Sequence, residues 1–361
     1  MMDIVEATRD YERWMRRCTS VIETDLRLKH RRMREDAFMF FRGTFYRWLQ
    51  IWPEVCPELS AAPRVLAVGD LHVGSFGTWR DGEGRLCWGV DDFDESARLP
   101  FAIDLVRLAA SAKVVIDAKH LSIKFRDACE AILDGYWRTL RSGGRPIVLA
   151  ERETNLERMG LEALKPPPDF WRKLQTLPAQ HHGLPREVLR TFKQSLPDPH
   201  LRYKVVRRKA GLGSLGQRRF VAIAEWNGGL IAREAKVMVP SAAAWLNGES
   251  HGGQPLYKSV LSSAVRSPDP FQTIVGEWLI RRLSPDSNPI EIANLPKRRD
   301  ETTLLHAMGA EAANVHLGSR RQIARILADL HRRKSTWLRR AGKAMAAAVE
   351  REWKIFRDSS T

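Results

Sequence analysis

The amino-acid sequence predicts an α+β fold with two lobes, a larger helical lobe and a smaller lobe built on a β-sheet. Residues 1–60 place apolar residues at three- and four-residue steps among charged ones, which is the spacing of amphipathic helices. Residues 202–239 are rich in β-branched and apolar residues and contain Asn227-Gly228, a dipeptide typical of hairpin turns. The chain has 361 residues, and at roughly 150 residues per domain this length favours two lobes.

Local patterns predict the remaining elements. Two short apolar segments, Val65 to Val68 and Leu86 to Val90, are expected to be strands, and each runs into a loop rich in carboxylates. The other expected elements are helices at 101–121 and 125–143, a loop-rich connection at 143–200, helix after Pro240, a strand at 289–295 and a basic helical C-terminus from Arg320. The predicted division is a helical lobe over 1–200, a β lobe over 201–300, and helices over 301–361 that return to the helical lobe.

Charge is the unusual feature of the composition. Lys and Arg total 59 against 43 Asp and Glu, which gives a net charge of +16. Such a surplus attracts polyanions, so a nucleic-acid partner bound by the basic residues 332–343 is a hypothesis, although the sequence does not favour it over a solvated helix face. No apolar run approaches the roughly 20 residues of a membrane span. The four cysteines form no CxxC pair, which together with the absence of a signal pattern leads us to expect a cytoplasmic protein.

A glycine-rich loop at residues 211–216, with the sequence GLGSLG, predicts a phosphate-binding turn. A dinucleotide-binding fold would continue from these glycines into a helix, whereas two strands around a hairpin follow here.

Strand, glycine loop, strand, strand is the arrangement of kinases, in which a lysine on the third strand reaches the phosphates. Lys236 is the expected lysine, with Arg233 a rival on the opposite face of that strand. The alternative is an ordinary three-stranded meander with a glycine turn. The expected nucleotide-binding residues of the loop are Gly211, Gly213, Ser214 and Gly216.

Two acidic loops indicate the chemistry of the helical lobe. Residues 69–77 read GDLHVGSFG, and residues 91–95 read DDFDE directly after an expected strand. Phosphoryl transfer needs a carboxylate that orients the attacking hydroxyl and oxygen ligands that hold Mg²⁺, and Asp70 suits the first role while Asp92 suits the second. The alternative is that these acids only cap turns. Asp70-x-His72 also resembles the start of a two-metal phosphoesterase site, but the sequence lacks the GDxxD and GNH segments that would complete one.

Together these motifs resemble those of an uncharacterised bacterial family, domain of unknown function 2252. The usual pattern of that family is GDxHxxNFG, then NDFDE, then DLxRLAxS, and this chain has GDLHVGSFG, DDFDES and DLVRLAAS in the same order. MREDAFMFFRG, GLGSLGQRRFVAI and AKVMVPSA resemble further segments of the family. The matching patches extend from about residue 31 to 318 and therefore cover most of the chain.

The same motifs are similar to those of aminoglycoside phosphotransferases and other kinase-like enzymes, in which the glycine loop and the lysine precede the catalytic loop. Here GDLH comes first, so the resemblance implies a circularly permuted kinase-like fold. Residues 306–318 resemble the helix that in those enzymes leads into the catalytic loop, yet here they lead to the basic C-terminus. Permutation is tolerated when the chain ends lie close together at the surface.

The resemblance implies a role for individual residues. Asp70 would be the catalytic base, in a loop that also carries His72, and Asp104 would brace that loop. Asp92 would be the main Mg²⁺ ligand and Asp94 an accessory one. The glycine loop and Lys236 would hold the phosphates of ATP, and Glu277 would be a helix glutamate paired with Lys236.

Several of these assignments have alternatives. Asp104 and Glu277 could be plain helical acids, and Arg42 of the FRG segment could bind phosphate or form a structural ion pair. Ser75 and Asp91 stand where the family has asparagines. Because serine is a shorter and weaker ligand, a second metal site would depend on Asp91 as well as Ser75.

The function expected from these features is ATP- and Mg²⁺-dependent phosphoryl transfer to a hydroxyl of an unidentified small molecule or protein. One alternative is a kinase-like module that binds a nucleotide without turnover. The other is a nucleic-acid-binding protein.

Overall fold

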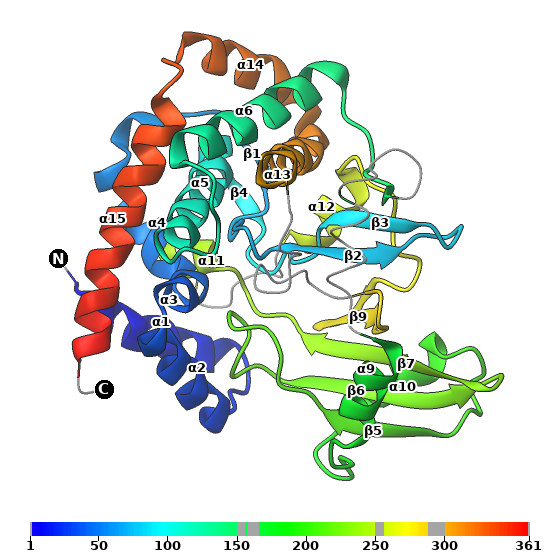
Figure 1. Cartoon of the computed structure of the whole chain (residues 1–361). Helices are drawn as coiled ribbons and strands as arrows, with labels where there is room; N and C mark the ends of the chain where they lie inside the picture. Colours follow the sequence, from blue (N-terminus) through cyan, green and yellow to red (C-terminus); the bar gives the residue numbers. More distant parts are fainter. Residues whose placement is uncertain (1, 150–155, 157–165, 250–255, 288–299, 360–361) are drawn as a thin grey trace.

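The computed structural model describes residues 2–149, 156, 166–249, 256–287 and 300–359. It confirms a mixed α+β architecture, in which a helical part lies beside a five-stranded antiparallel sheet and a short hairpin lies between them (Figure 1). Among the described helices, none combines the length and the apolar composition that crossing a bilayer requires.

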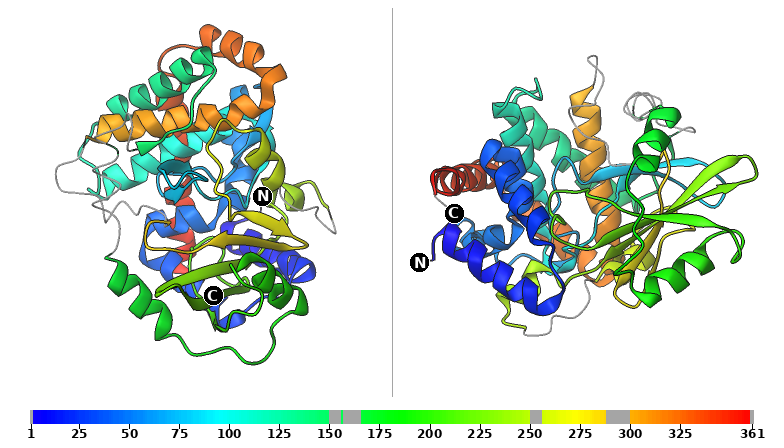
Figure 2. Two further views of the ribbon diagram at one scale, coloured as in Figure 1. Left: turned by 90° about the vertical axis from the view of Figure 1, so that its right-hand side faces the viewer. Right: turned by 90° about the horizontal axis from the view of Figure 1, so that it is seen from below.

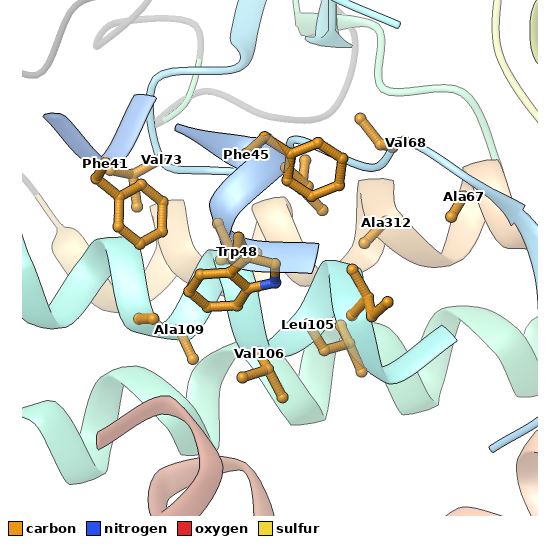
Figure 3. Close-up of a cluster of buried hydrophobic side chains, with 14 of the residues drawn as sticks. Phe41, Phe45, Trp48, Ala67, Val68, Val73, Leu105, Val106, Ala109 and Ala312 are labelled. Carbon is orange, nitrogen blue, oxygen red and sulfur yellow. The ribbon is translucent and has the colours of Figure 1, made fainter. Parts of the chain in front are cut away.

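The helical part is assembled from the two ends of the chain. Its helices are α1 (Ile4–Cys18), α2 (Glu23–Glu35), α3 (Ala37–Gly43), α4 (Phe45–Val55), α5 (Phe101–Asp117), α6 (Phe125–Ser142), α13 (Glu301–His316), α14 (Ile323–Arg332) and α15 (Trp337–Asp358). Helix α5 is apolar on nearly all sides and is contacted by α3, α6, α13 and α15, so it is the buried centre of this part. Figure 3 shows Phe41, Phe45 and Trp48 packed over Leu105, Val106 and Ala109 of α5.

Helices α6 and α13 cross at very short range because each presents a glycine to the other. A Cβ atom on Gly135 would lie 1.9 Å from the carbonyl oxygen of His306, and one on Gly309 would lie 2.0 Å from that of Ile132. Any side chain at these positions would therefore push the two backbones apart.

Two small two-stranded sheets carry the acidic loops. Strand β1 (Arg64–Ala67) pairs with β4 (Ala97–Pro100), and β2 (Phe76–Arg80) pairs with β3 (Leu86–Val90). The loop at 69–75 follows β1 and the loop at 91–96 follows β3, as expected. Strands β2 and β4 were not expected, because each is short and lacks a clear alternation of apolar and polar residues.

The larger sheet has the order β5-β6-β7-β9-β8, with β5 (Tyr203–Arg207), β6 (Arg219–Trp226), β7 (Gly229–Val237), β8 (Thr273–Val275) and β9 (Trp278–Arg282). Asn227 and Gly228 have φ values of 49° and 80° and form the expected hairpin turn between β6 and β7. Helix α10 (Arg186–Ser195) packs on one face of this sheet and α9 (Pro167–Gln175) on the other.

The structure corrects two expectations about secondary structure. Residues 273–282 form the β8–β9 hairpin and not a helix, because the side chains of β9 alternate between the two faces of the sheet and β9 pairs with the free edge of β7. The connection at 143–200 contains α9 and α10, whose apolar residues are held by the sheet. The strand expected at 289–295 lies outside the described residues.

The packing also bears on the expected lobes. Helices α9 and α10 precede residue 201 yet pack on the larger sheet, whereas α11 (Ala242–Leu246) and α12 (Tyr257–Ser263) pack on the helical core. Helix α1 begins and α15 ends on the side of the helical part away from the larger sheet (Figures 1 and 2). The two chain ends therefore lie near each other.

The glycine crossing generates a stability prediction. Gly309→Ala should lower the free energy of unfolding by about 1–3 kcal/mol, because the added methyl group overpacks the contact between α6 and α13. Denaturant titration measures this change. The matched control is Gly82→Ala, since a Cβ atom there has no neighbour within 4 Å, and equal stability of the two variants would contradict the proposed cause.

Candidate functional site

A cavity of about 1130 Å³ lies between the larger sheet and the helical part. It is lined by residues from α2, α3, the loops that follow β1 and β3, the glycine loop and one face of the larger sheet. Most residues singled out from the sequence line it together: Asp70, His72, Ser75, Asp91, Asp92, Asp94, Gly211, Gly213, Ser214 and Lys236. Asp104, Gly216 and Glu277 do not line the cavity.

Asp104 holds the loop that carries Asp70. Its carboxylate is fully buried on α5 and accepts hydrogen bonds from the backbone N–H groups of Val68 at 2.8 Å and Gly69 at 2.9 Å. Gly69 has a φ of 88°, and a Cβ atom there would lie 2.2 Å from the carbonyl oxygen of Glu95. The glycine therefore allows the two acidic loops to touch.

The same carboxylate also binds the end of α13. Nε2 of His316 lies 2.9 Å from Oδ2 of Asp104, and Nδ1 of His316 lies 2.7 Å from the hydroxyl of Tyr136. The hydroxyl of Ser319, just beyond α13, accepts a hydrogen bond from the N–H of Leu66 at 2.8 Å. The last turn of α13 is thus attached to β1 and to the start of the Asp70 loop.

Asp70 is paired with a buried arginine. Nε of Arg107, on α5, donates to Oδ1 of Asp70 at 2.5 Å. The Arg107 side chain is 1% exposed, and its guanidinium group lies over the rings of Phe41, Phe45 and Trp48. Burial raises the pKa of Asp70, while the charge of Arg107 acts in the opposite direction. Asp70 is therefore fixed in place and less acidic than an exposed aspartate.

His72 and Ser75 shape the loop around Asp70. Nδ1 of His72 accepts a hydrogen bond from the N–H of Gly74 at 3.1 Å. Burial, together with the charges of Arg42 and Arg107, lowers the pKa of His72 well below its ordinary value, so its ring is neutral. The Ser75 hydroxyl donates to the carbonyl of Asp70 and accepts from the N–H of His72, both at 3.0 Å. The Ser75 hydroxyl, which the sequence suggested as a metal ligand, thus forms hydrogen bonds within the loop.

The second acidic loop places its carboxylates beside Lys236. The Asp91 N–H donates to the carbonyl of Ser75 at 3.1 Å, which joins the two loops, and burial raises the pKa of Asp91 to about 6. The Asp92 side chain is 56% exposed and lies 3.8 Å from Nζ of Lys236. Oδ2 of Asp94 accepts a hydrogen bond from Nζ of Lys236, whereas its buried Oδ1 has no hydrogen-bond partner among the described residues.

One face of the larger sheet carries a cluster of cations around a buried glutamate. Glu234 is fully buried and binds Arg208 at 2.6 Å, Arg219 at 3.2 Å and Arg281 at 2.7 Å. Burial would raise the pKa of Glu234, but the three arginines hold it well below its ordinary range. Side chains alternate along strands, so Arg219, Glu234, Lys236 and Arg281 share this face, while Arg233 lies on the other and donates to the carbonyl of Ser195.

The glycine loop is docked against α2. The N–H of Ile22 donates to the carbonyl of Gly216 at 2.7 Å, and Leu212 and Leu215 are buried in the helical core. Gly211 and Gly216 have φ values of 71° and 97°, which few other residues tolerate. In the described part of the chain, the backbone N–H groups of Gly211, Gly213 and Ser214 make no hydrogen bond. These N–H groups are available to a ligand.

Glu277 is not the partner of Lys236. It lies in the turn between β8 and β9 and pairs with Arg218 at 3.0 Å. The expectation failed because the segment forms a hairpin instead of a helix, and Asp94 occupies the position beside the lysine. Arg42 forms no ion pair with any described residue, so the structural ion pair considered for it is not found.

The donor set fits a bound divalent cation only in combination with a ligand. Among the described residues, no three His, Cys, Asp or Glu side chains converge into a complete metal site. Mg²⁺ is commonly held by one or two carboxylates together with substrate phosphates. The exposed carboxylate of Asp92 and the unpartnered Oδ1 of Asp94 match that need.

Residues 17–166 match the model of a family described as "Uncharacterized protein conserved in bacteria (DUF2252)". This part of the chain is therefore similar to that family. The matched residues include both acidic loops, Asp104 and Arg107, but not the glycine loop or Lys236. None of the curated proteins and none of the solved structures that we compared matches the chain.

Sequence reasoning missed two parts of the site. Arg107 was missed because it lies in a mostly apolar helix, although an arginine flanked by apolar residues in such a helix is itself a signal of a buried ion pair. The cluster around Glu234 was also missed. The two-residue spacing of Glu234 and Lys236 on β7 is the signal that could have indicated it, because it places both side chains on one face of the sheet.

Glu95 gives the site a measurable pH signature. It accepts a hydrogen bond from the N–H of Ala242 at 2.6 Å, and burial raises its pKa from 4.5 to about 8. Between these values the unfolded chain releases a proton that the folded protein keeps, so this carboxyl makes the folded protein less stable as pH rises.

Glu95→Gln removes that effect. The stability of the variant relative to wild type should increase as pH rises from about 5 to about 8 and then level off. Denaturant titrations across this pH range measure the difference. Glu130→Gln, at an exposed position on α6, is the control and should follow the wild-type profile. A stability difference for Glu95→Gln that stays constant with pH would contradict the assignment.

Proposed function

We propose that the protein is a phosphotransferase that uses ATP and Mg²⁺ to phosphorylate a hydroxyl group, and that its fold is a permuted kinase-like one. The observation that carries the proposal is the convergence of the Asp70 loop, the Asp92–Asp94 loop, Lys236 and the glycine loop on one cavity. Lys236 donates a hydrogen bond to Asp94, which lies 142 residues earlier in the chain. The site is therefore assembled by the fold and not by local sequence.

The residues of the cavity divide the work of phosphoryl transfer. Lys236 and the unpartnered N–H groups of the glycine loop bind phosphate oxygens, while Arg107 holds Asp70 in position. Asp70 orients the acceptor hydroxyl. The acceptor oxygen forms a bond to the γ-phosphorus while the bond from that phosphorus to the β–γ bridging oxygen breaks. ADP leaves with the bonding electrons, and the hydroxyl proton passes to Asp70.

Mg²⁺ fits the arrangement beside Lys236. When bound, it supplies charge neutralisation for the phosphate oxygens. Asp92 and the unpartnered Oδ1 of Asp94 are the oxygens that would hold it. Without Mg²⁺, Lys236 neutralises the charge of Asp94, because burying a carboxylate without a partner costs free energy.

The attachment of α13 supports the permuted fold. In kinase-like enzymes a helix runs directly into the catalytic loop. Here the last turn of α13 is joined to the start of the Asp70 loop through His316 and Asp104, although the chain continues elsewhere. The neighbouring chain ends make such a rearrangement of order physically simple.

A module that binds nucleotide without turnover is the second candidate, and Ser75 is the observation that favours it. Its hydroxyl is engaged by Asp70 and His72, at the position where the family has an asparagine. Nucleotide binding alone therefore does not establish transfer. Loss of the γ-phosphate has to be measured separately.

The proposed site predicts that two carboxylates have separable effects. Asp70→Asn should reduce the turnover of ATP by about 10²–10⁴-fold, because the proton acceptor is lost, while nucleotide binding remains. Asp92→Asn should abolish the Mg²⁺-dependent part of ATP binding. The measurements are γ-phosphate release and thermal unfolding with ATP and Mg²⁺, alone and together. Saturation at 100 times Kd should stabilise the folded protein by about 2.7 kcal/mol.

Asp117→Asn is the matched control, because Asp117 is an exposed acid on α5 that pairs with Lys113 and does not line the cavity. It should bind and turn over like wild type. Absence of any nucleotide-dependent shift in the wild-type protein would contradict both candidates. A shift without γ-phosphate release would leave the binding module as the function.

A further inference from the structure

Cationic side chains of the N-terminal helices line one end of the cavity, opposite Asp70. Lys29 and Arg32 lie three residues apart on α2, and Arg42 is on α3; all three line the cavity. None of them lies within 4.0 Å of a carboxylate oxygen of a described residue. The other cations considered above are paired: Arg208, Arg219 and Arg281 with Glu234, and Lys236 with Asp94.

Arg42 is placed beside the reacting centre by aromatic contacts. Its guanidinium lies 5.8 Å from the centre of the Phe38 ring, and Phe38 packs edge-on against His72 of the Asp70 loop. The Nε atom of Arg42 is buried and has no hydrogen-bond partner among the described residues. A buried guanidinium atom without an acceptor is unusual, because burial removes the water that would satisfy it.

Lys29 reaches the same space beneath Gly43. Its side chain is buried, and the one hydrogen bond the structure records for its Nζ is to the carbonyl of Gly213, at 3.4 Å. A Cβ atom on Gly43 would lie 2.8 Å from Sδ of Met33 and 3.4 Å from Cε of Lys29, so the glycine leaves room for the lysine stem. Lys29 therefore faces the glycine loop from one side while Arg42 faces Asp70.

The acids at this end do not cancel these charges. Asp70 is bound by Arg107, and Asp36 accepts a hydrogen bond from the N–H of Met39 as the N-cap of α3. Glu95 is held by the N–H of Ala242. Backbone N–H groups leave the charge of a carboxylate in place, but the three cations outnumber these two acids, so a bound anion would neutralise the remaining positive charge.

We propose that the phosphate acceptor is a small hydroxyl compound that itself carries an oxyanion, a phosphate monoester or a carboxylate, which Arg42 binds with Lys29 and Arg32. This inference rests on the proposed phosphotransferase function and adds the class of acceptor. Arg42 holds the anionic group while Asp70 orients the hydroxyl. The same cations repel a polycationic acceptor, so the resemblance to aminoglycoside phosphotransferases does not extend to their substrates.

The test uses the full-length protein with its nucleotide site filled by Mg²⁺ and a non-hydrolysable ATP analogue, so that added anions cannot occupy that site. Calorimetry then measures the binding of four probes: glycerol 3-phosphate, glycerate, glycerol and kanamycin. Wild type should bind one or both anionic probes in preference to glycerol and kanamycin. The stronger of the two anions identifies the group as a phosphate or a carboxylate.

Arg42→Gln should weaken binding of the anion by about tenfold or more, through loss of a charge-assisted hydrogen bond, and should leave binding of the ATP analogue unchanged. Arg126→Gln, at an exposed position on α6, is the matched control and should bind like wild type. Anion binding that survives Arg42→Gln, stronger binding of glycerol or kanamycin, or no binding of either anion would overturn the inference.

The two titrations separate this inference from the proposed function. If the ATP analogue fails to bind wild type in the presence of Mg²⁺, the proposed function fails, and the acceptor assignment fails with it. If the analogue binds and the anions show no dependence on Arg42, the acceptor assignment alone fails.

Discussion

The buried carboxylate of Asp104 is the interaction on which the site depends. It has two oxygen atoms and three donors: the N–H groups of Val68 and Gly69 and the ring of His316. A buried carboxylate must be satisfied by hydrogen bonds, so its partners are fixed relative to one another. Asp104 therefore joins α5, the end of α13 and the start of the Asp70 loop. One side chain thus connects three segments that are distant from one another in the sequence.

Glu234 has the corresponding role in the larger sheet. Three arginines surround it, and their positive charges exceed what one carboxylate neutralises. The excess faces the cavity, because alternation along the strands places Lys236 and the arginines on that face. The sheet thus presents positive charge, while the loop at 91–95 presents negative charge opposite it. Lys236 bridges the two and would be released from Asp94 by a ligand that brings its own charges.

The two proposals follow from how charges in the cavity are paired. Where a cation has a carboxylate partner, as Lys236 has in Asp94, the proposed role is to hold a nucleotide and Mg²⁺. Where cations lack partners, as at Arg42 and Lys29, the proposed role is to hold an anionic acceptor. Asp70 lies between these regions, bound by Arg107 and kept less acidic by burial. This position is the one that a proton acceptor between two substrates requires.

Features that depend on near neighbours in the chain could be predicted from the sequence. The helices of residues 1–60, the hairpin at Asn227-Gly228 and the strand that carries Lys236 follow from periodicity and turn chemistry, which are local. Which distant groups come into contact depends instead on how the whole chain packs. Residues 273–282 form a β-hairpin because β9 pairs with the edge of β7. Lys236 pairs with Asp94 and not with Glu277, which pairs with Arg218. Arg42 forms no ion pair with a described residue. Pairings of this kind depend on what the fold brings within a few ångströms of a side chain, and no local pattern records that distance.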